Sequence, residues 1–281
     1  MKVGMNLLLW TAAADESHFD LVRKIGDWGF DGVEFPMFDP ACSPWKDYAS
    51  LLKDLNMGAT VVAVLPDETS LVSEDSGENQ RALDHLKASI DSCVELGAET
   101  MAGPIYHPVG GLVGRGPTED EHKRLADGLK ALSEHAKDSG VAISVEPLNR
   151  FETYVLNCAE QSRAVVDAVG EDNVGILYDT FHSNIEEKSI EDAIKAGGTK
   201  INHVHISAND RSTPGEDHVH WGENFSALKH IGYDGWLTIE AFGAWLPEIA
   251  GATCIWRKMA PSEEHLSTEG LKFVQDSWAS A

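Results

Sequence analysis

Basic residues are scarce in this sequence. Lys and Arg total 22 against 46 Asp and Glu, which gives a formal net charge of -24. A charge of this sign repels phosphate backbones and anionic membrane surfaces, so we expect neither nucleic acid nor a membrane as a partner. The simplest interpretation of the acidic surface is that it keeps the protein in solution.

Cysteine is also rare. The sequence has four, Cys42, Cys93, Cys158 and Cys254, which lie far apart and form no C-x-x-C pair. This spacing argues against a disulfide framework and favours reduced, mostly structural thiols. We therefore expect a cytoplasmic protein.

Long apolar runs are missing, since no stretch approaches the roughly 20 residues of a membrane span. The N-terminal run up to Trp10, followed by Ala12 to Ala14, imitates a short signal peptide. Asn6 interrupts it and only one basic residue, Lys2, precedes it, so we interpret the run as a strand. The glycine motifs of dinucleotide-binding and P-loop folds are absent as well.

The sequence does contain eight short runs rich in Val, Ile and Leu that alternate with amphipathic stretches. This alternation predicts repeated βα units, and eight units match a (β/α)8 TIM barrel, typically about 250 residues, better than a doubly wound sheet. We predict one α/β domain, residues 1–281, with an extra C-terminal helix from Pro261 to Trp278. The predicted strands are residues 3–10, 32–37, 59–65, 100–106, 141–148, 174–181, 201–207 and 236–242.

Four of the later strands carry a polar residue near their carboxyl ends, where the active sites of such barrels lie. These residues are Glu146, Asp179, His205 and Glu240, one from each of strands five to eight. Because successive strands supply them, we expect them to meet at a common point. His203 lies on the same face of its strand as His205, which we choose as the ligand because it is nearer the strand end.

Each of these acids, taken singly, could instead be a buried carboxylate paired with Arg or Lys. Three converging carboxylates would raise one another's pKa, and a bound cation is the simplest compensation. Three carboxylates and an imidazole suit an octahedral Mn²⁺, Mg²⁺ or Co²⁺ better than tetrahedral Zn²⁺. We therefore predict a single-metal site.

Further polar residues are expected at the barrel mouth, where they could bind hydroxyl groups. Arg150 and Glu152 follow strand five, while His182 and Arg211 lie in the loops after strands six and seven. The alternative for each is a solvated loop residue.

Two loops are open to a functional interpretation. Residues 109–118, VGGLVGRGPT, could form a lid or, through Arg115, a phosphate site, although a flexible surface loop is the interpretation that we favour. Residues 218–221, HVHW, are expected to be exposed, with Trp221 a candidate for the pocket wall. Glu186 and Glu187 are expected on a helix, without a chemical role.

Longer motifs add a resemblance that spans nearly the whole chain. They are EPLNRFETYVLN from Glu146, DTFHSNIEE from Asp179, HVHIS with the later NDRSTPG, GYDGWLTIEAF from Gly232 and IWRKM from Ile255. With these motifs the chain resembles the ketose 3-epimerases, the tagatose/psicose (allulose) and L-ribulose 3-epimerase group of the xylose isomerase-like TIM barrel superfamily.

The resemblance implies one divalent cation per subunit, Mn²⁺ before Co²⁺ or Mg²⁺, with Glu146 and Glu240 also serving as the acid/base pair. These glutamates would invert C3 of a free ketose through a cis-enediolate. The resemblance also implies a homodimer or homotetramer. The residues that it implies for substrate binding are Glu152, His182, Arg211, Trp10 and Glu34.

Other activities stay open. An aldose-ketose or hydroxypyruvate-type isomerase could use the same site, because a shift of one carbon in the bound substrate changes the product. Ser207-Ala208 stands where these epimerases usually carry Gly-Glu, and NDRSTPG looks closer to sugar-phosphate isomerases and epimerases. A hydrolase of the endonuclease IV type would need three zinc ions and a basic groove, which the charge of -24 disfavours. A non-catalytic sugar- or metal-binding barrel would not need two opposed carboxylates.

Overall fold

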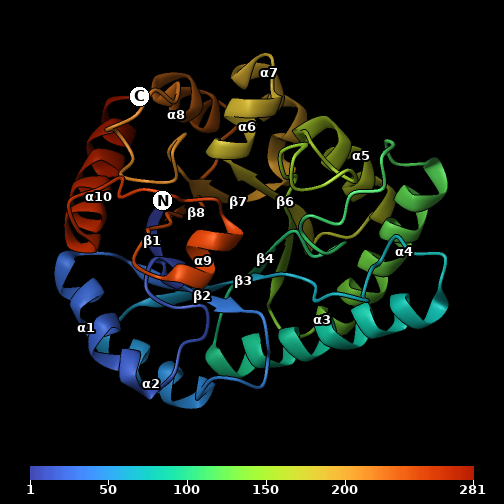
Figure 1. Ribbon diagram of the computed structural model, residues 1–281, viewed down its shortest axis with the longest axis horizontal. Helices are drawn as coiled ribbons and strands as arrows, with labels where there is room; N and C mark the ends of the chain where they lie inside the picture. The colour runs from blue at the N-terminus through green and yellow to red at the C-terminus, as the bar shows by residue number, and fades with distance from the viewer.

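The computed structural model describes residues 1–281 and shows a closed barrel of parallel strands in chain order, with β1 paired to β8. Helices surround the barrel (Figure 1), so the predicted (β/α)8 fold is confirmed. The strands are β1 (Lys2–Asn6), β2 (Gly32–Met37), β3 (Gly58–Ala63), β4 (Thr100–Gly103), β5 (Ala142–Val145), β6 (Val174–Asp179), β7 (Ile201–Ile206) and β8 (Trp236–Ile239).

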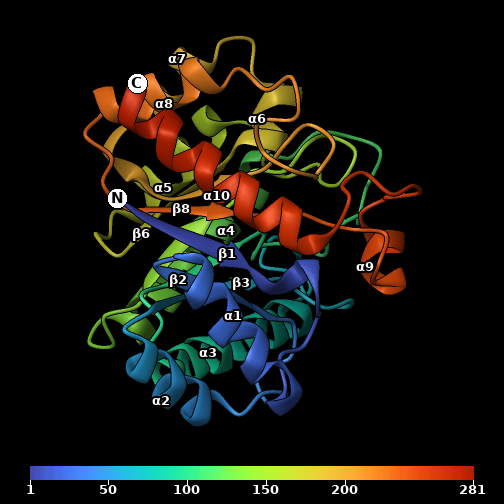
Figure 2. The ribbon, with the colours of Figure 1, turned by 90° about the vertical axis from the view of Figure 1, so that its left-hand side faces the viewer.

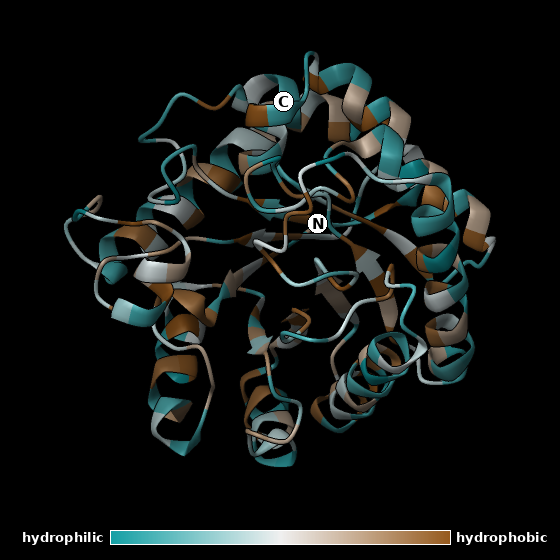
Figure 3. Ribbon diagram, turned by 45° about the vertical axis from the view of Figure 1, so that its right-hand side comes forward, coloured by the Kyte–Doolittle hydropathy of each residue, from teal (hydrophilic) through white to brown (hydrophobic).

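The helices follow the strands and pack their apolar sides on them, and Figure 3 shows that they carry both hydrophobic and hydrophilic residues. Tyr48 of α2, for example, packs its ring 4.8 Å from that of Phe35 on β2. The helices are α1 (Phe19–Trp28), α2 (Trp45–Leu55), α3 (Ser76–Leu96), α4 (Glu119–Ala136), α5 (Ala159–Val169), α6 (Thr180–Glu186), α7 (Ile190–Gly197), α8 (Trp221–His230), α9 (Pro247–Ala252) and α10 (Glu263–Ser280), with short 3₁₀ helices at Leu7–Leu9, Glu16–His18 and Gly198–Lys200. None of them combines the length and the apolarity that crossing a bilayer requires.

Several strands end earlier than predicted. β1 stops at Asn6 rather than Trp10, because the Asn6 side chain accepts a hydrogen bond from the backbone N–H of Leu8 and caps the 3₁₀ helix that follows. β5 stops at Val145 and β8 at Ile239, so Glu146 and Glu240 directly follow their strands. These side chains therefore stand at the rim of the barrel.

The predicted C-terminal helix is present as α10, which contacts β1, β8 and α8. It lies along the side of the barrel in Figure 2. Its buried residues include Leu266, Leu271 and Val274. The helix therefore covers the join between the first and last strands.

The carboxyl end of the barrel carries a second, small apolar cluster. Residues of α9 take part in it, and Figure 2 shows α9 at the end of the barrel opposite the N-terminus. The cluster consists of Leu8, Val62, Phe242, Ile249, Ala250 and Ile255. It builds an apolar wall beside the strand ends.

The opposite end of the barrel is filled by Trp236. Its ring lies where side chains at Gly32 and Gly58 would otherwise stand, so these two positions require the absence of a Cβ atom. The indole N–H donates to Glu99, which also accepts from Lys2. Lys2 Nζ in turn lies 4.8 Å from the centre of the Trp236 ring, so a packed and hydrogen-bonded floor closes this end.

Candidate active site

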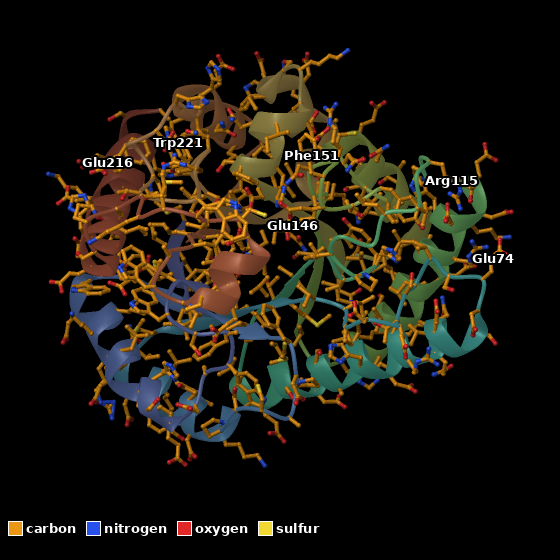
Figure 4. The ribbon with its side chains drawn as sticks, viewed as in Figure 1. Glu74, Arg115, Glu146, Phe151, Glu216 and Trp221 are labelled. Atoms are coloured by element: carbon orange, nitrogen blue, oxygen red, sulfur yellow. The ribbon has the colours of Figure 1, made fainter.

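The structure brings the four predicted ligand residues together. Glu146, Asp179, His205 and Glu240 are all buried, and one ligand atom from each lies within 4.8 Å of the others. Figure 4 shows Glu146 near the centre of the ring of elements. The four side chains meet because parallel strands direct their carboxyl ends to the same rim.

His205 is oriented so that one ring nitrogen faces this cluster. Its Nε2 lies 2.7 Å from an oxygen of Glu34. Its Nδ1 is buried without a hydrogen-bond partner, 3.3 Å from Glu240 Oε1 and 3.8 Å from Asp179 Oδ2. An unpartnered imidazole nitrogen beside three carboxylates is a donor set that fits a hard divalent cation. These residues could therefore hold a metal ion.

Arg211 supplies the positive charge that lies against the cluster. Its Nη1 is 2.7 Å from Glu240 Oε2 and 3.2 Å from Asp179 Oδ2, and it also donates to Ser207 Oγ. The guanidinium lies 3.7 Å from the centre of the Phe181 ring. The pairing of buried acids with an arginine, the simpler interpretation of the sequence, is thus present for two of the three carboxylates.

One guanidinium does not balance three buried carboxylates. Burial raises the pKa of Glu146 well above its usual range, and the neighbouring Glu240 raises it further. Burial likewise raises the pKa of Asp179 to about 7, although Arg211 opposes the effect. Burial acts on Glu240 too, but His205 and Arg211 hold its pKa below the usual value. If all three acids are ionised, as metal ligation requires, their charge exceeds that of Arg211, and a divalent cation would compensate it.

A cavity of about 400 Å³ opens beside the cluster. Both polar and apolar side chains line it. Its polar lining consists of Glu146, Glu152, His182, Arg211, Glu240, Asp67 and Thr253. Its remaining lining residues are Leu8, Phe38, Val62, Val64, Leu65, Pro66, Pro104, Pro108, Val109, Leu148, Phe181, Phe242, Ile249 and Ala252.

His182 presents a neutral imidazole to this cavity. Its Nδ1 accepts from the backbone N–H of Asn149 at 2.9 Å, so the ring proton lies on Nε2. Burial, together with Arg211, lowers its pKa well below the usual value. Nε2 lies 3.6 Å from Glu146 Oε1 and 3.1 Å from Arg211 Nη2. Two N–H donors therefore converge, and an acceptor oxygen between them would satisfy both.

Glu152 also lines the cavity. The side chain of Asn149 donates to its carboxylate at 2.7 Å, and its backbone oxygen accepts from Gly110. Its carboxylate keeps further lone pairs for a ligand hydroxyl group.

Trp10 and Glu34 do not line the cavity, in contrast to the expectation from the resemblance. Trp10 follows the 3₁₀ helix after β1 and packs its ring 6.4 Å from that of Trp28. Glu34 is fully buried inside the barrel, on the side of His205 away from the carboxylates. Trp10 lies away from the cavity because β1 ends four residues before it. Glu34 lies deep in the barrel because its side chain points inward from β2.

Other candidates are engaged elsewhere. Arg150 pairs with Glu186, and Glu187 accepts from the backbone N–H of Ala159, so these residues hold loops and helices together. Arg115 pairs with Glu121 of α4 and does not line the cavity.

Trp221 does not wall the cavity either. It packs against Phe225 and Phe273, and its indole N–H donates to Asp217. Figure 4 shows both Arg115 and Trp221 well away from Glu146.

The apolar wall and the polar supports of the site were not predicted from the sequence. Asn149, Asn6 and Thr60 are buried and hydrogen-bonded to residues in or behind the cluster. One signal was available, since Asn6 is a polar residue inside an otherwise apolar strand. No comparable signal marks Phe38 or Ile249, whose positions depend on loop packing.

The chain is similar to known proteins in both sequence and fold. Residues 22–276 match the family described as xylose isomerase-like TIM barrel. The chain is 34% identical to a probable ketose 3-epimerase of Synechocystis sp., covering 99% of this chain and 97% of that protein. It is 30% identical to an L-ribulose 3-epimerase of Mesorhizobium japonicum, covering 97% and 93% respectively.

Solved structures agree with these matches. A structure of an L-ribulose 3-epimerase superimposes with a TM-score of 0.93 at 30% identity, covering 99% of this chain and 95% of that one. A D-allulose 3-epimerase from Methylomonas sp., in complex with D-allulose, superimposes with a TM-score of 0.91 at 25% identity, covering 99% and 97%. The similarity thus extends over the whole barrel.

Proposed function

Since the chain belongs to the xylose isomerase-like TIM barrel family and, within it, to the ketose 3-epimerases, which are carbohydrate isomerases, we propose that it inverts C3 of a free ketose with one divalent cation. The observation that carries the proposal is the convergence of Glu146, Asp179, His205 and Glu240 beside the cavity. The two glutamates would be the acid/base pair.

The cation would be held by these four side chains. When bound, it would polarise the carbonyl and hydroxyl oxygens of the ketose and so make the C3 proton more acidic. The hard donor set favours Mn²⁺, with Co²⁺ or Mg²⁺ as alternatives. The unpartnered Nδ1 of His205 supports this assignment.

Inversion needs a base on each face of C3. Glu146 follows β5 and Glu240 follows β8, so the two carboxylates approach the cavity from different parts of the rim. One would remove the C3 proton, leaving a cis-enediolate of the sugar, and the other would return a proton to the opposite face. Each such transfer contributes roughly 10²- to 10⁴-fold in rate.

The remaining polar groups of the cavity would position the sugar. The N–H groups of His182 and Arg211 converge on a point where a sugar oxygen can accept from both. Glu152 would accept a hydrogen bond from a hydroxyl group. These three contacts would fix which carbon of the ketose faces the two glutamates.

The charge of the cavity favours a free ketose over a sugar phosphate. Arg211 is the only basic side chain besides His182 in its lining, and it is already paired with Asp179 and Glu240. Asp67 also lines the cavity, and its carboxylate would repel a phosphate group. A phosphate there would be desolvated without a partner.

Proton exchange measured by NMR tests the proposal. Free and phosphorylated ketoses are incubated with the enzyme and Mn²⁺ in D₂O, and products and deuterated carbons are identified. We expect C3 epimers with deuterium at C3 from free ketoses. Aldoses with exchange at another carbon would instead establish the isomerase alternative, and product only from phosphorylated ketoses would overturn the substrate assignment.

Two isosteric variants assign the acid/base pair. Glu146→Gln and Glu240→Gln are each expected to abolish epimerisation and C3 exchange, because the amide cannot transfer the proton. Glu74→Gln is the matched control, since the Glu74 side chain is exposed and lies at the periphery of the molecule in Figure 4. Full activity in either active-site variant would exclude that residue from proton transfer.

We also propose a homodimer or homotetramer, as the resemblance implies, in the cytoplasm. The cysteines are all free in the structure, which is compatible with a reducing compartment. Light scattering of the purified protein would measure the oligomeric state.

A further inference from the structure

We propose that Glu34 is a positioning residue that fixes the ring orientation and proton position of His205, with His203 as a second donor to the same carboxylate. This inference rests on the cation site of the proposed function. In this role Glu34 contacts the ligand residue His205 and does not contact the substrate.

Both oxygens of Glu34 are occupied in the barrel interior. Oε2 lies 2.7 Å from His205 Nε2 and 2.8 Å from Asn6 Nδ2. Oε1 lies 2.7 Å from His203 Nε2 and 2.9 Å from Thr60 Oγ1. Asn6 and Thr60 stand beside Glu34 in the register of β1, β2 and β3. Three adjacent strands thus hold the carboxylate in place.

The direction of these hydrogen bonds determines where the imidazole protons lie. An ionised carboxylate only accepts, so all four partners must donate. The Asn6 amide can do so because its oxygen already accepts from the backbone N–H of Leu8. Both imidazoles therefore carry a proton on Nε2, and His205 has only Nδ1 to offer to the carboxylate cluster.

His203 contributes to the orientation of the ligand ring. The two rings lie 5.3 Å apart at 75° in an edge-to-face arrangement, and both are fully buried. Because His203 occupies the other oxygen, the Glu34 carboxylate is held in one rotamer, with Oε2 toward His205. Partners behind a ligand typically change metal affinity by 10- to 100-fold when they are removed.

The first test observes the wild-type protein, and variants serve only to assign its signals. In protein with ¹⁵N-labelled histidine, loaded with diamagnetic Mg²⁺, the Nε2 atoms of His205 and His203 are expected to show a directly bonded proton. Assignment uses His203→Asn and His205→Asn. An Nε2 atom of His205 without a bonded proton would overturn the inference.

The second test compares two replacements of Glu34 by Mn²⁺ affinity, measured by competition with a chelator. Glu34→Met removes both acceptors at similar volume and is expected to weaken Mn²⁺ binding by 10- to 100-fold. Glu34→Gln keeps one acceptor. In this variant the side-chain amide oxygen is expected to face Asn6 and His205, because Asn6 offers only an N–H donor there. The amide nitrogen would then face Thr60 and His203. The Gln variant should therefore lose less than about tenfold and retain the Nε2 proton of His205.

The outcomes separate this inference from the proposed function. Wild-type affinity in Glu34→Met, or an equal loss in both variants, would overturn the positioning role while leaving the epimerase proposal intact. Absence of epimerase activity in a wild-type protein that binds Mn²⁺ would overturn the function and leave the role of Glu34 standing. If Glu34→Met does not fold, the wild-type NMR experiment and the Gln variant still decide.

Discussion

Replacing Glu121 by Gln is expected to destabilise the protein by about 2 to 3 kcal/mol at pH 7 and by less as the pH falls. The buried carboxylate of Glu121 accepts two hydrogen bonds from Arg115, two from Thr118 and one from Tyr154. It forms the capping box of α4 and holds the end of the loop that follows β4. That loop supplies part of the cavity wall.

The magnitude follows from the pKa of this group. Hydrogen bonds from Arg115, Thr118 and Tyr154 lower the pKa of Glu121 from 4.5 to about 2. At about 1.4 kcal/mol for each pKa unit, this difference corresponds to about 3 kcal/mol of stability at neutral pH. Arg115 is half exposed, so solvent screening reduces the effect. Because the folded-state pKa is the lower one, the stabilisation is present above pH 4.5 and is lost as the pH falls toward 2.

Urea denaturation of the wild type and Glu121→Gln between pH 7 and pH 3.5 measures this difference. About 1 kcal/mol of it should be lost by pH 3.5. Glu119→Gln is the matched control, because Glu119 is an exposed acid in the first turn of the same helix, and its effect should stay below about 1 kcal/mol. A difference between wild type and Glu121→Gln that does not change with pH would refute the reasoning.

Further predictions concern the cavity, the cation and the thiols. Arg211→Met should lower kcat/KM by about 100-fold or more through loss of a donor to substrate, and unchanged steady-state kinetics would contradict this. Ile249→Ala should raise KM with little change in kcat, because this contact lies on the apolar wall away from the reacting carbons, and a large fall in kcat would count against it. Mn²⁺ at 100 times its Kd should stabilise the fold by about 2.7 kcal/mol, seen as a higher Tm that a chelator reverses, whereas a Tm insensitive to Mn²⁺ would argue against the site. A thiol reagent should label the exposed Cys42 and Cys254 but not Cys93, whose thiol pKa burial raises, and rapid labelling of Cys93 would contradict the packing.

The barrel and the ligand cluster could be predicted because both depend on regular features of the chain. The alternation of apolar runs and amphipathic stretches determines the βα repeat, and a polar residue such as Asp179 or His205 at a strand end must lie at the rim. Glu146 and Glu240 follow the same rule although their strands end just before them.

The rest of the site depends on contacts that strand periodicity does not contain. Arg211 reaches the carboxylates from a left-handed backbone conformation, with φ at 62°. Phe38 and Ile249 reach the cavity from loops and a short helix. Glu34 lies on a predicted strand, but strand periodicity does not show whether its side chain contacts substrate or lies behind His205. That depends on how deep in the packed barrel the side chain lies.

The floor formed by Trp236, Lys2 and Glu99 has a practical consequence for handling the enzyme. Because that end is packed shut, substrate, water and product must all pass through the opening beside α9. The N-terminus lies at the floor end, as Figure 2 shows. A fusion partner or a solid support attached at the N-terminus would therefore lie at the end of the barrel away from the entrance and would not cover it.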